Sequence, residues 1–258
     1  MDVSVILPLY IFPSPGAWDR FYELASLHPR IQFTAIVNPN SGPGEDSLPN
    51  EHYMLGIRRL HAFGNVRVVG YVPTTWCMKN LSLVLYEIAA YSRWGELDSS
   101  LALNGIFFDE TPTSFTTENM SFLRRITNAV RASPGLKEAY VVHNPGALPD
   151  EQYLREPDFA DLTVIFEDTY SNWTARADSL IQATQSCDHV NLALILHSVP
   201  ALSRTDAESI IREAFMVGHS IWLTSTRDYT ALDSHFSVLV DNLDALSRQV
   251  GTLGPCSA

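Results

Sequence analysis

Residues 105–110 read GIFFDE and residues 162–168 read LTVIFED. In each stretch an unbroken apolar run ends abruptly in carboxylates. A continuous apolar run is typical of a parallel strand that is buried on both faces, and the residues just after such strands form the face on which α/β barrels carry their chemistry. Two such strand ends, two strands apart, can direct carboxyl groups toward one pocket. A pair of carboxylates in a cleft is typical of glycosidic bond cleavage.

Apolar runs separated by helical patterns recur along the whole chain. We predict strands at Val3–Leu9, Phe33–Val37, Val66–Tyr71, Gly105–Phe108, Ala139–Val142, Leu162–Phe166, Asn191–Leu196 and Ser220–Leu223. We predict helices at Pro15–Leu27 with Ser14 as the N-cap, and at His52–Ala62, Leu81–Trp94, Glu118–Arg131, Asp150–Leu154, Thr174–Gln185, Thr205–Val217 and Leu232–Gln249. Strand–helix units without a linker indicate an α/β fold, a single (β/α)8 TIM barrel over residues 1–258. The competing doubly wound sheet would carry Gly-x-Gly-x-x-Gly where residues 8–13 read PLYIFP.

The composition limits the partners. The chain of 258 residues has 17 Lys and Arg against 29 Asp and Glu, a net charge of −12. This balance argues against nucleic acid, whose phosphates require positive side chains. No Cys-x-x-Cys or clustered Cys and His pattern indicates a metal, and no Gly-rich phosphate loop indicates a nucleotide. We therefore expect no cofactor and no metal. We also expect a monomer.

Short signals bear on localisation. No basic segment followed by an apolar one opens the sequence, yet acceptor sequences for N-glycosylation begin at Asn80, Asn119 and Asn172. We expect a secreted or cell-surface anchored protein whose targeting segment is absent from this sequence. If a disulfide forms, Cys187 and Cys256 are the expected pair, both at the bottom of the barrel, whereas Cys77 is expected at the top.

The residues that follow the predicted strands combine aromatic rings, amides and acids, without lysine. Sugars are bound by such mixtures, because pyranose faces stack on aromatic rings while hydroxyls need polar partners. We predict a polysaccharide partner and an acidic catalytic site at Asp109, Glu110 and Glu167. The candidate substrate contacts are Tyr10, Asn38, Asn40, Tyr71, Trp76, His143, Asn144, Trp173 and His197.

Structural roles compete with these assignments. Acids at strand ends often cap the next helix, which is the favoured interpretation for Asp168. His143 and His197 are each isolated, and such a histidine is more often hydrogen-bonded in a pocket or core than bound to substrate. Trp76 and Trp173 are expected in loops just after strand ends, where they can form sugar platforms. Tyr170 and Tyr229 are further possible pocket walls.

Together these residues resemble the spherulin-4 (spherulation-specific) family of fungal and microbial proteins, classed as glycoside hydrolase family 135. The resemblance covers nearly the whole chain. It is carried by Val5–Tyr10, Ala35–Gly44, Gly70–Thr74, Gly105–Glu110 and Phe166-Glu167. It implies a (β/α)8 barrel that cleaves α-1,4-linked N-acetylgalactosamine in galactosaminogalactan, a cell-surface and biofilm polysaccharide, with Asp109, Glu110 and Glu167 as the acidic site. It also implies a secreted or anchored protein.

The hypothesis from these residues is a retaining endo-glycosidase. Asp109 would act as nucleophile and Glu167 as general acid/base, its pKa raised by burial and by nearby negative charge, while Glu110 would position substrate or tune the pair. Attack by the substrate's own N-acetyl group is an alternative. Two other classes stay open: a non-catalytic glycan-binding barrel, and a polysaccharide deacetylase, which would need a metal held by His and Asp.

Overall fold

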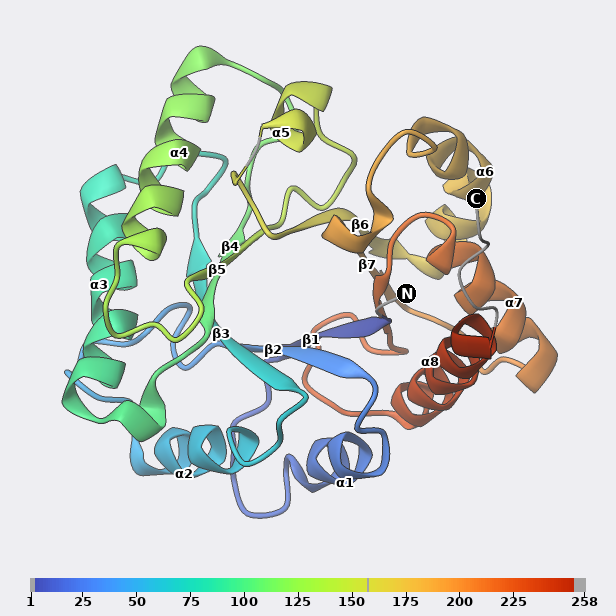
Figure 1. The fold of residues 1–258 in the computed structure, drawn as a ribbon, viewed down its shortest axis with the longest axis horizontal. Helices are drawn as coiled ribbons and strands as arrows, with labels where there is room; N and C mark the ends of the chain where they lie inside the picture. The colour runs from blue at the N-terminus through green and yellow to red at the C-terminus, as the bar shows by residue number, and fades with distance from the viewer. Residues whose placement is uncertain (1–2, 157, 253–258) are drawn as a thin grey trace.

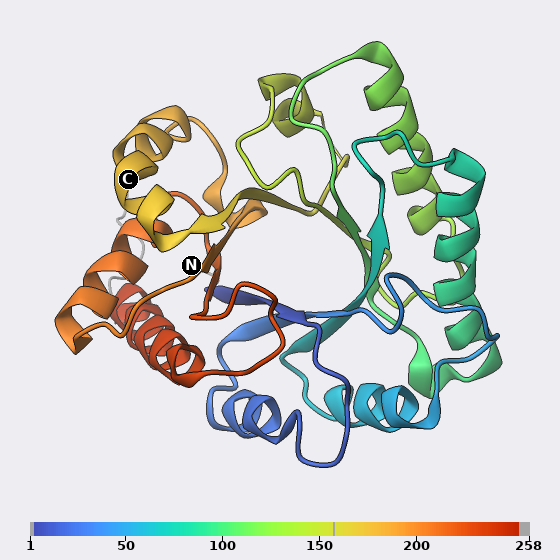
Figure 2. The ribbon, with the colours of Figure 1, turned by 180° about the vertical axis from the view of Figure 1, so that it is seen from behind.

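The computed structural model describes residues 3–156 and 158–252, and these form a closed barrel of parallel strands surrounded by helices (Figures 1 and 2). The strands are β1 (Ser4–Leu9), β2 (Gln32–Val37), β3 (Val66–Pro73), β4 (Gly105–Asp109), β5 (Tyr140–His143), β6 (Leu162–Thr169), β7 (Leu192–His197) and β8 (Ser220–Leu223). The helices are α1 (Asp19–Leu27), α2 (Glu51–Leu60), α3 (Leu81–Leu97), α4 (Thr117–Arg131), α5 (Glu151–Arg155), α6 (Tyr170–Ala183), α7 (Arg204–Phe215) and α8 (Ser234–Thr252), with short 3-10 helices η1 (Ser99–Leu101) and η2 (His189–Asn191). The predicted TIM barrel is confirmed.

The barrel interior forms because strand residues are apolar and largely β-branched or aromatic, which suits a pleated surface buried on both sides. Phe107 in β4 stacks on Tyr71 in β3, with ring centroids 6.2 Å apart. Phe108, the next residue, packs against His143 on the opposite side of the sheet. Alternation along β4 therefore places Asp109 on the same side as Phe107. Gly105 allows β4 to approach β5, since a Cβ there would stand 1.9 Å from the Tyr140 carbonyl oxygen.

Two predicted helix starts are wrong. The Ser14 cap before Pro15 does not form: Gly16 adopts φ +86°, which interrupts helical geometry, and α1 begins only at Asp19. In the other direction, α6 begins at Tyr170 rather than Thr174, because the Thr169 hydroxyl caps it by accepting from the backbone N–H of Asn172. The earlier start moves residue 173 from a loop into a helix.

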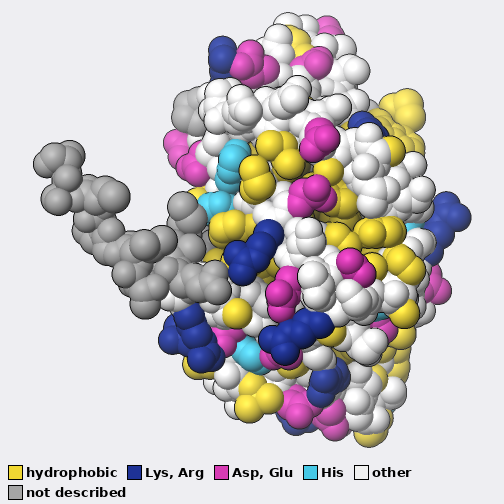
Figure 3. All heavy atoms as spheres, turned by 90° about the vertical axis from the view of Figure 1, so that its right-hand side faces the viewer, with side chains coloured by type: hydrophobic (Ala, Val, Ile, Leu, Met, Phe, Trp, Pro, Cys, Tyr) yellow, Lys and Arg dark blue, Asp and Glu magenta, His cyan; other side chains and the backbone are white. Residues whose placement is uncertain are grey.

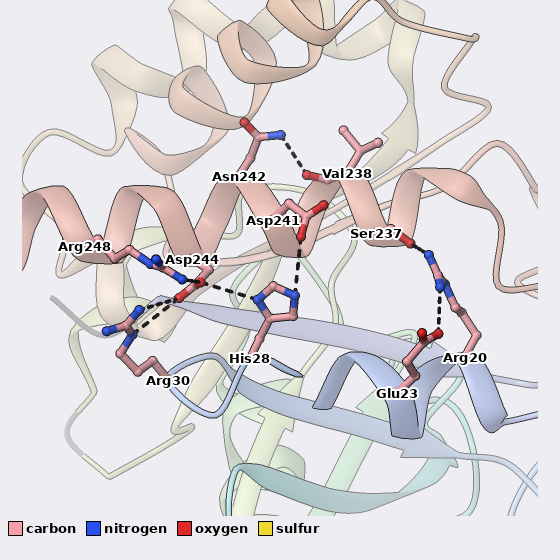
Figure 4. Close-up of polar contacts among 10 residues, drawn as sticks. All are labelled: Arg20, Glu23, His28, Arg30, Ser237, Val238, Asp241, Asn242, Asp244 and Arg248. Carbon is pink, nitrogen blue, oxygen red and sulfur yellow. Dashed lines mark hydrogen bonds and ion pairs between the residues drawn. The ribbon is translucent and has the colours of Figure 1, made fainter. Parts of the chain in front are cut away.

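The barrel closes at a narrow seam. β1 and β8 share a single register pair, Ser4 with Ser220, whereas β1 and β2 pair along six residues. α8 reinforces the seam from outside by burying Phe236 and Leu243. Its polar side contacts the segment after α1 through a cluster of acidic, arginine and histidine side chains centred on Asp244 (Figure 4).

The outer surface is mixed in charge. On the side that carries α6, α7 and α8, acidic and basic side chains are interspersed with scattered apolar ones (Figure 3). No continuous basic face is visible on that side (Figure 3). In residues 3–156 and 158–252, no helix combines the length and the apolar character that crossing a membrane requires.

Candidate active site

The centre of the site is a carboxylate pair bridged by an amide. The Asn144 side chain donates through Nδ2 to Asp109 Oδ1 at 2.7 Å and to Glu167 Oε2 at 2.6 Å. Because both oxygens contact one nitrogen, they lie within about 5 Å of each other, close to the separation of the carboxyl groups in retaining glycosidases. The structure therefore brings together Asp109, the last residue of β4, and Glu167, which lies near the end of β6.

Two tyrosines complete the hydrogen bonding of the acids. The Tyr71 hydroxyl donates to Asp109 Oδ2 at 2.8 Å, and the Tyr229 hydroxyl donates to Glu167 Oε1 at 2.7 Å. Tyr10, which follows β1, stands between them, its ring centroid 5.7 Å from that of Tyr71 and 5.9 Å from that of Tyr229. A closed ring of six side chains therefore lies at the carboxyl ends of the strands: Asn144, Asp109, Tyr71, Tyr10, Tyr229 and Glu167.

Local backbone features place these side chains. Asn144 directly follows β5, and its Oδ1 accepts from the N–H of Gly146, which holds the amide in one orientation. The Glu167 N–H in turn donates to the Gly146 carbonyl at 2.9 Å. β6 carries an irregularity between Val164 and Phe166, where its register against β7 shifts. Such bulges re-aim side chains beside active sites, and here the strand continues beyond it to present Glu167.

The two acids are surrounded by hydrogen-bond donors that carry no charge. Burial raises the pKa of Glu167, and the charge of Asp109 adds to this, while hydrogen bonds from Tyr229 and Asn144 act in the opposite direction. Asp109 accepts three hydrogen bonds, from Asn144, Tyr71 and the Glu110 N–H. No ion pair within the described part of the chain involves either carboxylate. The pair is held by neutral donors alone.

The three tyrosines remain protonated. Burial, followed by the charge of neighbouring carboxylates, raises the pKa of Tyr10, Tyr71 and Tyr229 above the usual range of a phenol. The bonds from Tyr71 to Asp109 and from Tyr229 to Glu167 therefore persist through the neutral and mildly alkaline range.

Glu110 lies beside the ring rather than in it. Its backbone is left-handed, with φ +53°, and its carbonyl accepts from the Thr74 hydroxyl at 2.8 Å and from the Trp76 N–H at 2.6 Å. Its carboxylate is half-buried and makes no hydrogen bond to the residues that the structure describes. A non-glycine residue held in this conformation is strained, and such strain is concentrated at functional sites.

Four other predicted contacts lie at or after the carboxyl ends of β2, β3 and β7. Asn38 supports the loop after β2, with its Oδ1 accepting from the Gly42 N–H, while Asn40 is exposed in the same loop. His197, at the end of β7, has its ring 6.4 Å from that of Tyr229. Trp76 is exposed in the loop after β3. These residues surround the mouth of the barrel without joining this ring of side chains.

Two predicted substrate contacts are wrong. His143 is 4% exposed and packs between Phe108 and Phe159 on the outer side of the sheet, where burial lowers its pKa to about 3. Trp173 is fully buried in α6, where its Nε1 donates to Glu213 at 2.8 Å. Neither side chain reaches a surface that a sugar could contact.

Two more assignments change in detail. Asn144 was expected to contact substrate, but its amide is occupied by the two acids and by Gly146. Tyr229 was expected only as a possible wall, yet it is a direct partner of Glu167. Asp168 has the structural role that was favoured for it, accepting from the Thr169 N–H and from Asn172 Nδ2 at the start of α6.

The residues that the structure describes do not bring three or more His, Cys, Asp or Glu side chains into a metal-binding arrangement. His143 and His197, the two histidines that follow predicted strands, lie on different sides of the sheet wall. The expected disulfide partner Cys256 lies outside the described residues, and among the residues that the structure describes Cys77 and Cys187 form no disulfide.

Comparison with known proteins agrees with this geometry. The sequence model of spherulation-specific family 4 matches residues 4–243. The chain belongs to this family. Spherulin-4 of Physarum polycephalum is 32% identical over 170 residues, which cover 66% of this chain and 46% of that protein, so the chain spans less than half the length of this relative.

A solved structure extends the family comparison to the fold. The crystal structure of Aspergillus clavatus Sph3 in complex with GalNAc superposes with a TM-score of 0.87 at 37% sequence identity. The match covers 94% of this chain and 98% of Sph3. The family member described here therefore shares the entire barrel with a protein that has been crystallised with a sugar.

Proposed function

We propose that this protein is an endo-acting glycoside hydrolase that cleaves α-1,4-linked N-acetylgalactosamine in galactosaminogalactan with retention of configuration. The observation that carries the proposal is the carboxylate pair that shares the Asn144 amide at the mouth of the barrel. The likeness to Sph3, crystallised with GalNAc, supports the sugar. The acidic chain also suits a polymer that becomes cationic wherever it is deacetylated.

The roles follow from the environment of each acid. Glu167, whose pKa is raised, holds a proton that it donates to the leaving oxygen. Asp109 accepts hydrogen bonds only, so a lone pair can attack the anomeric carbon and form a glycosyl ester. Ionised Glu167 then removes a proton from water, which releases the sugar and restores both groups. Glu110, next to the pair, orients the substrate.

Digestion of purified galactosaminogalactan tests the activity. We expect internal cleavage, seen by mass spectrometry as a ladder of N-acetylgalactosamine oligosaccharides, and NMR of the first product should show the α-anomer. A β-anomer would overturn retention. Saturable binding without new reducing ends would overturn hydrolysis and favour the glycan-binding barrel.

The nature of the nucleophile needs its own test. A 5-fluoro-N-acetylgalactosaminyl inhibitor should leave a covalent adduct on the peptide that contains Asp109. Potent inhibition by a thiazoline analogue without any adduct would favour attack by the substrate's N-acetyl group.

We also propose that the protein acts outside the cell as a monomer. Asn80 and Asn172, two of the three possible glycosylation sites, are exposed. Secretion from a eukaryotic host should yield a glycosidase-sensitive mass increase, and light scattering should give the mass of one chain. An unmodified or dimeric product would contradict the respective part of this proposal.

A further inference from the structure

The loop after β3 contains a left-handed turn. Thr75, Trp76 and Cys77 adopt φ values of +50°, +52° and +64°. None of them is glycine, and each such conformation brings Cβ close to the following carbonyl oxygen, which L-residues avoid. Three successive residues of this kind require support from their surroundings.

That support comes from the catalytic strand. The Trp76 N–H donates to the Glu110 carbonyl at 2.6 Å, and the Thr74 hydroxyl donates to the carbonyls of both Asp109 and Glu110, at 3.0 and 2.8 Å. At its other end the turn is fixed by Lys79, which binds both carboxylate oxygens of Glu87 at 2.7 Å. The turn is therefore tied directly to the residues that carry the proposed chemistry.

The turn carries a solvent-exposed indole, that of Trp76. Trp76 is 53% exposed, whereas the chain's four other tryptophans, Trp18, Trp94, Trp173 and Trp222, are at most 1% exposed. The left-handed backbone costs stability, and the exposed indole gains little from burial to offset that cost. The backbone hydrogen bond from Trp76 to Glu110 places this exposed ring beside the proposed active site.

We infer that Trp76 is a stacking platform for a pyranose ring of the polysaccharide, at a subsite that flanks the point of cleavage. This inference rests on the proposed function. The apolar C–H face of a galactose-type ring packs on an indole, and the ring needs no charge to bind there. The left-handed turn fixes the indole in advance, so little conformational entropy is lost on binding.

Kinetics on substrates of different length test the inference. Trp76→Asn keeps a residue that tolerates a left-handed backbone, so we expect the melting temperature to be unchanged or higher. Its kcat/KM on the polymer should fall about tenfold, mainly through KM. On the shortest cleaved oligosaccharide, which leaves the flanking subsite empty, the fall should be much smaller. Met78→Ala, in the same loop and 74% exposed, should match the wild type. Equal activity of Trp76→Asn and wild type on the polymer would overturn the inference.

Binding provides a readout that is independent of hydrolysis. In Glu167→Gln, acrylamide should quench mainly Trp76, because it is the accessible tryptophan, and N-acetylgalactosamine oligosaccharides should reduce that quenching. The same oligosaccharides should have no such effect in Glu167→Gln with Trp76→Phe if the indole is the platform. Unprotected Trp76 at saturating oligosaccharide would contradict the inference. Protection in a protein whose wild type releases no reducing ends would uphold the platform and reject hydrolysis.

Discussion

Two acidic clusters in this barrel are built on opposite principles. At the closure seam, Asp244 contacts two guanidinium groups, Arg248 at 2.5 Å and Arg30 at 3.3 Å, and the His28 imidazole at 3.5 Å (Figure 4). At the mouth, Asp109 and Glu167 contact only neutral donors, from Asn144, Tyr71 and Tyr229. One carboxylate is matched by positive charge and the other two face each other.

The pKa values differ in the same way. Although burial opposes it, the guanidinium groups of Arg248 and Arg30 lower the pKa of Asp244. Burial and Asp109 raise that of Glu167. A carboxylate paired with cations is held in its charged form and serves the fold, whereas Glu167, which has no such partner, keeps its proton to higher pH than an ordinary glutamate. Among the described residues, the lack of a cationic partner thus distinguishes the cluster of Asp109 and Glu167 from the cluster at the seam.

The largest expected effect is on catalysis at Glu167. Glu167→Gln keeps the shape and most hydrogen bonds but cannot donate or accept the proton. We expect kcat to fall about a thousandfold or more, measured by release of reducing ends from galactosaminogalactan. Asp244→Asn is the matched control, an acid-to-amide change in the other cluster, and its activity per folded molecule should equal that of the wild type. Near-normal turnover of Glu167→Gln would remove this residue from the reaction.

A second prediction concerns the bridging amide. Asn144→Ala removes the donor shared by Asp109 and Glu167, so kcat should fall about a hundredfold through loss of positioning. The hydrogen bond from Asn144 lowers the pKa of Glu167, so its loss should raise that pKa and move the alkaline limb of the pH–rate profile to higher pH. An unmoved limb, with folding verified by circular dichroism, would mean that the amide does not tune the acid.

A third prediction concerns stability at the seam. Asp244→Asn leaves the seam cations without their carboxylate, and we expect a loss of about 1–3 kcal/mol in the free energy of unfolding at pH 7. Because the pKa of Asp244 is lowered in the folded state, its contribution is present above the unfolded pKa and is lost as pH falls through the folded value. Denaturant titrations of wild type and variant should therefore converge in acid. A difference that is constant with pH would contradict this account.

The fold could be predicted because its signal is repeated. Each strand is an apolar run, and helical patterns separate the runs, so errors at single ends did not change the topology. β6 was predicted to end at Phe166 but continues to Thr169, since the polar residues at its end still pair with β7. No apolar pattern marks that extension.

The site could be predicted only in part, for geometric reasons. Asp109 and Glu167 follow apolar strands and were found. His143 and Asn144 are adjacent polar residues, and the one-residue difference that turns Asn144 inward and His143 outward is set by β5 pairing. Tyr229 comes from an irregular loop, with φ +56°, and no periodicity points to it. The Thr169 and Asn172 spacing of an N-cap could have identified Trp173 as helical.

The smallest expected effect has the opposite sign to that at Asp244. A carboxyl group whose folded pKa is raised stabilises the fold below its unfolded pKa and loses that contribution as pH rises through the folded value. Ionisation of Glu167 therefore destabilises the barrel, because burial and the neighbouring Asp109 disfavour its charged form and no cation compensates it. Glu167→Gln should melt about 1–3 °C above the wild type at pH 7, a gain of less than about 1 kcal/mol, and the gain should vanish near pH 4. Differential scanning calorimetry at both pH values measures it. The contrast between the two clusters requires that an acid-to-amide change stabilises the protein at the mouth and destabilises it at the seam. It would fail if Glu167→Gln and Asp244→Asn shifted the melting temperature in the same direction at pH 7.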